Sequence, residues 1–443
     1  MAGNRRAGVR CRGMVGIPLA LMIGAALWAD AAAAESLPAI KVAVGAPATF
    51  ATHAELERYG FSFGPSDGQF GAIPTGGGRY RFYGTAGSTA SCAGTPNAKG
   101  STFGFTGTLD HVTGSNGCRR LFGPDDGPPG WIFDKNYAGG GQIVPFALAG
   151  RRGWLLTFHA EVWWENKDRA DRKCAVGGGS GSAVPCFYSS LGLAVSTDDG
   201  RSFKVAGQIM QPSQPIAAFM GSGRNMPVGY GSLIVADAEG RHLDNPPPDP
   251  GAAYFYLVFS DILPGAPGPC ARFICAGVAR ARYADVITAA LSGDPHKLAT
   301  VFHKYDGASG DAWTQPATGD SPDQTGNAGR HMPIWTDETA AGIDVLYDAS
   351  FNVYLAVYQT LDGFKLRASN DLIHWTKPLG PPVQEAGRTY YYPTLIGETG
   401  DPTVGGPAPR LYFTSFPVGA FPNYKTSTFQ SIALTLSRGD SDP

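Results

Sequence analysis

The sequence predicts an all-β protein folded as a five-bladed β-propeller of four-stranded antiparallel blades. Its apolar runs are short, rich in β-branched and aromatic residues, and bounded by Gly, Pro, Asp or Asn, which is typical of strands. Amphipathic helical periodicity is scarce, and only 284–291 is expected to form a short helix. A strand, a tight turn and a second strand recur five times, and such internal repetition favours a propeller.

The repeat consists of five hairpins. They span 69–84, 142–161, 231–240 with 253–261, 343–359, and 391–400 with 410–416. Further strands follow the second hairpin at 189–207 and the fourth at 365–377, so two successive hairpins make one four-stranded blade. Only 430–437 follows the fifth hairpin, and we expect 39–45 to supply its outer strand and close the ring. A large β-sandwich with long loops is the alternative architecture.

The N-terminus predicts an export signal. Four arginines precede an uncharged apolar stretch, 14–28, which leads into small residues where signal peptidase would cut. The stretch is too short to span a bilayer comfortably. We therefore expect a signal peptide at 1–34 and one mature domain at 35–443, secreted to the periplasm or outside the cell without a membrane anchor.

Six of the seven cysteines lie beyond this signal. An even number of cysteines in an exported chain indicates disulfides. Their clustering in three close pairs predicts three local bridges: Cys92 with Cys118, Cys174 with Cys186, and Cys270 with Cys275. No CxxC or HxxxH spacing accompanies them, which argues against a zinc site.

Charge and motif content exclude several classes of function. The net charge is −2 and 16% of the residues are charged, so the chain lacks the basic footprint that binding to nucleic acid requires. It also lacks the G-x-S-x-G elbow of α/β-hydrolases.

Two turns carry a family resemblance. The segment 196–203 matches the Asp-box pattern of sialidases and other propellers at five positions: Ser196, Asp198, Gly200, Ser202 and Phe203. The segment 368–376 resembles the related turn of the five-bladed glycoside hydrolases of families 43 and 32 and their relatives. With the blade rhythm, the resemblance covers most of the mature chain, although the family's usual catalytic signature is not obvious.

The resemblance implies a secreted glycoside hydrolase that acts on a poly- or oligosaccharide with carboxylates around a central funnel, in some relatives with calcium in the channel. Glycosidic cleavage needs one protonated and one ionised carboxyl beside the scissile bond. In a propeller, the starts of the innermost strands and the ends of the second strands lie at one face. This placement selects Asp67 as base or nucleophile, Glu161 as acid and Asp261 as modulator.

The same face supplies the predicted binding residues. The segment 158–166 combines an acid with a histidine and two tryptophans, a mixture suited to sugar faces and hydroxyls. The predicted substrate-binding residues are His159, Trp163, Trp164, Gln142, Arg330, His331 and Tyr391. An ordinary structural role is the alternative for each, as for Asp67 in its Ser-Asp-Gly turn.

Two other functions compete with the glycosidase. A noncatalytic carbohydrate-binding propeller would keep the funnel without an acid pair. A sialidase-like enzyme would need an arginine cluster and a tyrosine nucleophile, for which Arg330, Arg388 and Tyr391 are candidates.

Overall fold

The computed structural model describes most of the chain beyond the predicted signal. It covers residues 37–439 except for 65–66, 90–91, 93–97, 99, 164–172, 176–182, 186, 215–227, 264–269, 271–273, 309–311 and 320–327. The residues described belong to one compact unit, Leu37–Pro443. The predicted signal peptide, Trp164 and Cys186 lie outside them, as does the side chain of Cys174.

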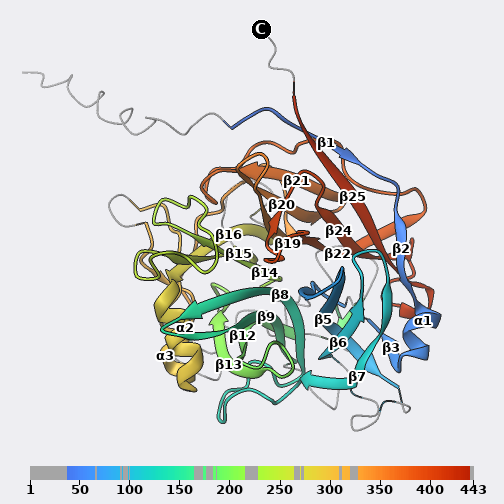
Figure 1. Ribbon diagram of the computed structural model, residues 1–443, viewed down its shortest axis with the longest axis horizontal. Coiled ribbons are helices and arrows are strands. Elements are labelled where there is room, and N and C mark those ends of the chain that lie inside the picture. The colour runs from blue at the N-terminus through green and yellow to red at the C-terminus, as the bar shows by residue number, and fades with distance from the viewer. Residues whose placement is uncertain are drawn as a thin grey trace, which may run out of the picture. The chain divides into compact units, whose positions relative to one another are not determined.

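Five sheets surround a common axis and form the predicted five-bladed β-propeller, so the sandwich alternative is wrong (Figure 1). Blade 1 contains β4 (Gly71–Gly76), β5 (Arg79–Ser88), β6 (Ser101–Gly107) and β7 (Val112–Phe122), with β3 (Phe61–Phe63) beside β5. Blade 2 contains β8 (Tyr137–Leu148), β9 (Arg151–Trp163), β12 (Phe187–Ser196) and β13 (Lys204–Met210). Between β9 and β12, β10 (Lys173–Ala175) pairs with β11 (Ala183–Pro185).

The remaining blades vary the same plan. Blade 3 contains β14 (Gly231–Ala236), β15 (Tyr254–Ile262), β16 (Ile274–Arg282), β17 (His303–Lys304) and β18 (Gln315–Pro316). Blade 4 contains β19 (Ala341–Asp348), β20 (Val353–Thr360) and β21 (Gly363–Ser369), with β23 (Val404–Gly405) parallel to β19. Blade 5 contains β22 (Arg388–Ile396), β24 (Arg410–Pro417) and β25 (Thr428–Arg438).

The N-terminal strands close the ring, as predicted. β1 (Ile40–Val44) pairs antiparallel with β25, and β2 (Ala48–Thr52) pairs with the beginning of the same strand. Figure 1 shows these blue strands beside the red end of the chain. Blade 5 is therefore built from both ends of the described chain, and blade 1 follows directly on its N-terminal strands.

Two-residue turns fix the first two hairpins. Gly77 and Gly78 join β4 to β5, and Ala149 and Gly150 join β8 to β9, with positive φ at all four residues. Consecutive positive φ angles give the type I′ geometry, whose twist matches that of antiparallel strands. Each inner strand thereby passes directly into the second strand of its blade.

The helices lie at the edge of the propeller. The predicted helix is present as α2 (Tyr283–Ser292), and α3 (Pro295–Ala299) follows it. The sequence analysis did not predict α1 (His53–Arg58), although Thr52 and Glu55 form a capping box at its start. None of the helices in the described residues is long and apolar enough to cross a membrane.

The turn at 196–203 joins blade 2 to blade 1. Asp198 accepts hydrogen bonds from Ser196 Oγ at 2.8 Å and from the Ser202 amide at 3.0 Å, and the Gly200 amide donates to Ser196 Oγ. Tyr83 of β5 donates its hydroxyl to the Gly200 carbonyl. A side chain on Gly200, where φ is +72°, would clash with that tyrosine.

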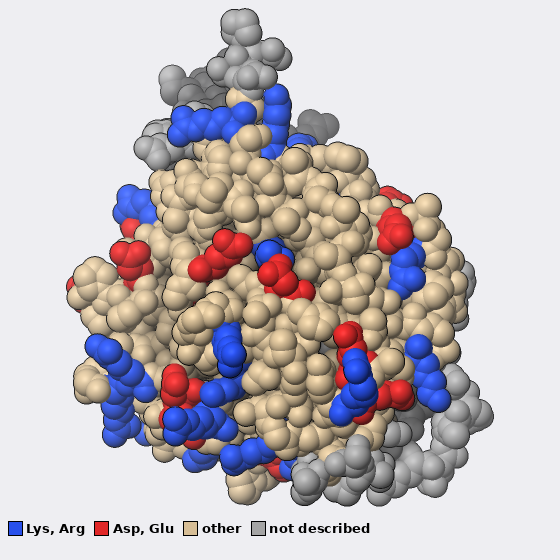
Figure 2. All heavy atoms as spheres, turned by 45° about the vertical axis from the view of Figure 1, so that its right-hand side comes forward, with Lys and Arg blue, Asp and Glu red and all other residues tan. Residues whose placement is uncertain are grey.

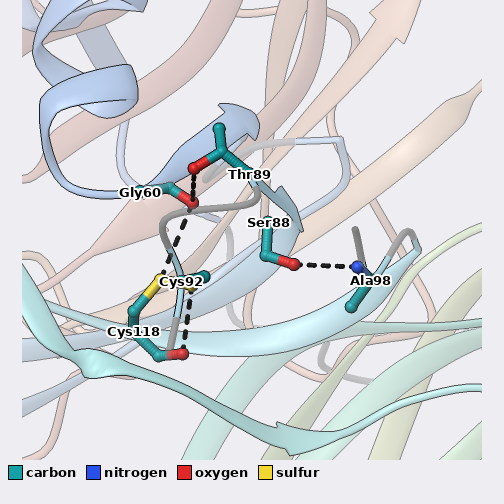
Figure 3. The surroundings of a disulfide bond; sticks show 6 residues. All are labelled: Gly60, Ser88, Thr89, Cys92, Ala98 and Cys118. Carbon is teal, nitrogen blue, oxygen red and sulfur yellow. Dashed lines mark hydrogen bonds between the residues drawn. A yellow bond between two sulfur atoms is a disulfide. The ribbon is translucent and has the colours of Figure 1, made fainter. Parts of the chain in front are cut away.

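Two of the three predicted disulfides lie in the described residues, and both are present. Cys92–Cys118 has a Cα–Cα distance of 5.5 Å, and Cys270–Cys275 one of 5.4 Å. The first lies against the Gly60 carbonyl, below the end of α1 (Figure 3). Disulfides fit an exported protein, because oxidising compartments maintain them.

On the face that Figure 2 shows, acidic and basic side chains are interspersed among uncharged residues. Among the surface ion pairs of the described residues is that between Arg410 and Asp110 at 2.7 Å. No single-sign field of the kind that binds nucleic acid is visible there.

Asp134 offers a test of buried charge in the loop between β7 and β8. Its side chain is fully buried, and neither carboxylate oxygen has a hydrogen-bond partner among the described residues. Burial raises the pKa of Asp134 to about 7, and the charges of Asp125 and Asp126 add to the effect. Since this pKa exceeds that of an unfolded aspartate, about 3.9, stability is lost as the pH rises from about 4 to about 7.

We expect Asp134→Asn to raise the free energy of unfolding at pH 8 by up to about 4 kcal/mol, since one pKa unit corresponds to about 1.4 kcal/mol. At pH 4 the two proteins should differ little, because Asp134 is then protonated in wild-type protein as well. Urea unfolding at both pH values measures the change. A difference between the two proteins that does not vary with pH would contradict the assignment.

Candidate active site

Side chains from four blades meet at the face where the inner strands begin. Asp67 precedes β4, Tyr137 begins β8, and Tyr230 precedes β14. Blade 5 contributes Tyr392 from β22, and Tyr424 from the short helix η3 (Tyr424–Thr426) between β24 and β25. These five residues form the Asp67 cluster.

Four tyrosine hydroxyls surround Asp67. Tyr392 donates to Oδ1 at 3.1 Å, and Tyr424 donates to the same oxygen. Tyr137 and Tyr230 donate to the main-chain carbonyl of Asp67, the latter at 3.0 Å. None of the hydrogen bonds from described residues ends on Oδ2, although the Tyr137 hydroxyl also lies close enough to the carboxyl group to lower its pKa.

The turn around Asp67 serves these contacts. The hydrogen bonds that its carboxyl group makes with described residues go to Tyr392 and Tyr424 of blade 5. Gly68 has φ +149°, and a Cβ there would lie 2.7 Å from the Tyr230 ring. Glycine is thus needed at this position for the close approach of Tyr230.

Glu161 lies near Asp67, from the end of β9. Its Oε1 is 3.2 Å from His159 Nε2, and its Oε2 accepts a hydrogen bond from Trp163 Nε1 at 2.8 Å. The His159 ring packs on Tyr230 at a centroid distance of 4.8 Å. His159, Glu161 and Trp163 therefore form one hydrogen-bonded group beside the Asp67 cluster.

The two carboxyl groups are electrostatically coupled. Burial raises the pKa of Asp67 above its ordinary value; the hydrogen bond from Tyr424 opposes this rise, and the charge of Glu161 adds to it. Burial also raises the pKa values of all four tyrosines well above 10, so they remain hydrogen-bond donors at neutral pH. Glycosidic cleavage uses two carboxyl groups placed on either side of the scissile bond.

Tyr391, the predicted residue, has its ring 5.9 Å from that of Tyr392 but makes no hydrogen bond to Asp67 within the described residues. Its ring stacks on Phe421 at a centroid distance of 4.2 Å, whereas Tyr392 reaches Asp67. The pairing of β22 with β24 shifts register between Tyr391 and Thr394, and Tyr392 has φ +61°. This bulge breaks the alternation of side chains and turns Tyr392 toward the axis.

Asp261 lies in a separate, fully buried group. Its Oδ2 is 4.0 Å from Lys304 Nζ, 3.7 Å from His331 Nδ1 and 3.2 Å from the Ser213 amide. Burial raises the pKa of Asp261 to about 6 and lowers that of Lys304 to about 8. No described contact joins Asp261 or His331 to the Asp67 cluster, and Arg330 is exposed on the preceding loop.

Gln142 lies on the axis, where its amide ties inner strands together. Its Nε2 donates to the Val345 carbonyl at 2.9 Å, and its Oε1 accepts from the Leu233 amide at 2.6 Å. Asp344 lies beside it, accepting from Ser232 Oγ and from the Leu395 amide. Burial raises the pKa of Asp344 to about 7.

These axial residues form the floor of the site. Ser232 lies two residues after Tyr230, and Leu395 lies three residues after Tyr392. Gln69, two residues after Asp67, donates to the Ile343 carbonyl at 2.6 Å. Hydrogen bonds between blades thus fill the axis directly beyond the Asp67 cluster.

The calcium ion that the family resemblance implies stays an expectation. No three His, Cys, Asp or Glu side chains among them form a group that could hold a metal ion. Asp67 and Glu161 are bonded instead to tyrosine, histidine and tryptophan. No step below involves calcium.

None of these four tyrosines is among the predicted site residues. Tyr230 and Tyr392 were identifiable only as residues near strand starts, and the bulge that selects Tyr392 has no signal in the sequence. The second hairpin is predicted to begin at Gln142, after a run of glycines, yet β8 already begins at Tyr137. A side chain on Gly139 would clash with Thr85 and with Tyr137 itself, so these glycines serve close packing within a strand. Tyr424 lies in a connecting segment without periodicity.

No family model and no curated protein matches the chain. Solved structures similar to it include glycoside hydrolases. The catalytic domain of the Coprinopsis cinerea GH62 alpha-L-arabinofuranosidase is 11% identical, with 92% of this chain and 100% of that chain covered and a TM-score of 0.44. A family 117 glycoside hydrolase of Zobellia galactanivorans is 9% identical, with 91% and 93% covered and a TM-score of 0.45. The endo-1,5-alpha-L-arabinanase of Thermotoga petrophila is 11% identical, with 84% and 71% covered and a TM-score of 0.38. Similarity at this level does not assign an activity to the chain.

Proposed function

We propose that the protein is a secreted glycoside hydrolase that cleaves an extracellular glycan with Asp67 and Glu161 as its catalytic carboxyl pair. The observation that supports the proposal is that Asp67 of blade 1 and Glu161 of blade 2 lie close enough, where the inner strands begin, for the charge of Glu161 to raise the pKa of Asp67. Glycosidic cleavage requires such a pair. The predicted signal and the two disulfides support export.

The hydrogen bonds support distinct roles for the two acids. Glu161 donates a proton to the leaving glycosidic oxygen, and His159, 3.2 Å from its Oε1, can return one. Asp67 acts through Oδ2, either by attacking the anomeric carbon or by removing a proton from the attacking water. Tyrosine hydroxyls and rings suit an oligosaccharide, because they combine hydrogen bonding with apolar stacking surface.

A carbohydrate-binding propeller without catalysis is the second candidate. It is favoured by the engagement of both Glu161 oxygens, one by His159 and the other by Trp163. The sialidase-like alternative has less support: Arg388 is bonded to Ser415, and Tyr391 stacks on Phe421.

A hydrolysis screen tests the proposal. Wild-type protein is incubated with plant, algal and microbial glycans beside Glu161→Gln, and released reducing ends are measured. We expect hydrolysis by the wild type and a loss of about 10²-fold or more in the variant. Glu398→Gln, an exposed acid beyond the other end of β22, is the control and should match the wild type.

Wild-type cleavage that survives Glu161→Gln unchanged would remove Glu161 from the mechanism. Glycan binding by calorimetry without any cleavage would favour the noncatalytic function.

A further inference from the structure

We propose that Tyr424 is a positioning residue that, with Tyr392, holds Asp67 ionised and turns its Oδ2 toward the substrate. The role assigned to Oδ2 rests on the proposed glycosidase function. The hydrogen bonds themselves do not, so they can be tested without activity.

Tyr424 is held firmly in place. It lies in the segment 418–427, which joins β24 to β25. The Val418 amide donates to the Gly387 carbonyl at 3.1 Å, and Phe421 stacks on Tyr391. The Tyr424 ring packs against Phe63 at 5.2 Å and Phe416 at 5.3 Å between centroids. Its hydroxyl therefore reaches Asp67 from a fixed direction.

The four tyrosines divide their contacts in a way that orients the carboxyl group. Two hold the main-chain carbonyl of Asp67 and two hold Oδ1. Contacts on the main-chain carbonyl and on Oδ1 restrict rotation of the carboxyl group, and in this proposal Oδ2 is the oxygen that acts on the substrate. Preorganisation of this kind lowers the cost of reaching the transition state.

The tyrosines also oppose the forces that would protonate Asp67. The titratable groups facing it are Glu161 from β9, Tyr137 from β8, Tyr230, Tyr392 and Tyr424. Burial and the Glu161 charge favour a neutral Asp67, whereas hydrogen bonds from hydroxyls to a carboxylate favour the ionised form. Tyr424 makes the largest such contribution to the pKa of Asp67.

The test compares Tyr424→Phe with wild-type protein. If hydrolysis is found, we expect the acidic limb of the kcat/KM profile to move to higher pH by about one unit, because this limb reports an ionised base in the free enzyme. We also expect kcat to fall about tenfold or more while KM changes little. A purely structural role would lower activity without moving the limb, and that result would overturn the proposal.

Tyr80→Phe is the matched control. Tyr80 is a buried tyrosine near the start of β5, at the opposite end of blade 1, and its hydroxyl makes no hydrogen bond in the described part of the chain. Its profile should coincide with that of the wild type.

Unfolding measurements separate this proposal from the proposed activity. Tyr424→Phe should destabilise the protein more at pH 7 than at pH 4, because the hydroxyl stabilises the ionised Asp67. In an Asp67→Asn background that pH dependence should vanish. If no glycan is cleaved but this pattern appears, the role of Tyr424 and Tyr392 in stabilising ionised Asp67 is supported, and the proposed hydrolase activity is wrong. A loss of stability independent of pH would overturn the role of Tyr424 even in an active enzyme.

Discussion

Asp67→Asn is expected to lower the rate of glycan hydrolysis by about 10³-fold. The amide is nearly the same size as the carboxyl group and can accept the hydrogen bonds from Tyr392 and Tyr424. The main-chain carbonyl that receives the other two tyrosines is unchanged. What the variant loses is the negative oxygen that would act on the anomeric carbon or on water.

Initial rates of reducing-end release, measured for both proteins at the optimum pH of the wild type, give the size of this effect. Asp362→Asn, in the exposed turn between β20 and β21, is the control and should keep the full rate. A retained rate in Asp67→Asn, with an unchanged unfolding temperature, would show that Asp67 has no chemical role.

Removal of the Cys92–Cys118 bridge as a double alanine variant should lower the free energy of unfolding by about 3.5 kcal/mol. The bridge closes a sequence separation of 26 residues, so its loss frees a long loop in the unfolded chain. The bridge also packs against Gly60, which ends the turn after α1 and has φ +92°. A Cβ on Gly60 would lie 2.7 Å from Cys118 Sγ. Urea unfolding without reductant measures the loss.

The second bridge is the matched comparison. Cys270–Cys275 spans a separation of 5, and the loop-entropy relation makes its contribution about 1.5 kcal/mol smaller. Equal losses in the two double variants would show that loop entropy is not the origin of the stabilisation.

The sequence was sufficient for the fold because the hairpins repeat. Glycine-marked turns at 76–78 and 149–153 separate strands with clear apolar character, and the two ends of the chain each hold an unpaired strand that only closure satisfies. α1 and β3 were missed because they lie between the closing strands and blade 1, outside the repeat. The capping box of Thr52 and Glu55 was the available signal for α1.

The candidate site was predictable only in part. Strand ends predicted Asp67 and Glu161 at one face, and in the structure the charge of Glu161 raises the pKa of Asp67. The same reasoning selected Asp261, which faces Lys304 within the protein. A residue at a strand end can point along the axis or between blades. The bulge in β22 determines that Tyr392, and not Tyr391, bonds to Asp67. Such choices depend on packing between blades, which no local pattern records.

The order of synthesis separates Asp67 from its two hydrogen-bond partners in blade 5. Asp67 is made early, and its partners Tyr392 and Tyr424 follow 325 and 357 residues later. A growing chain therefore carries the acid long before the tyrosines that orient it exist. The Asp67 cluster is complete only after Tyr424 has been synthesised.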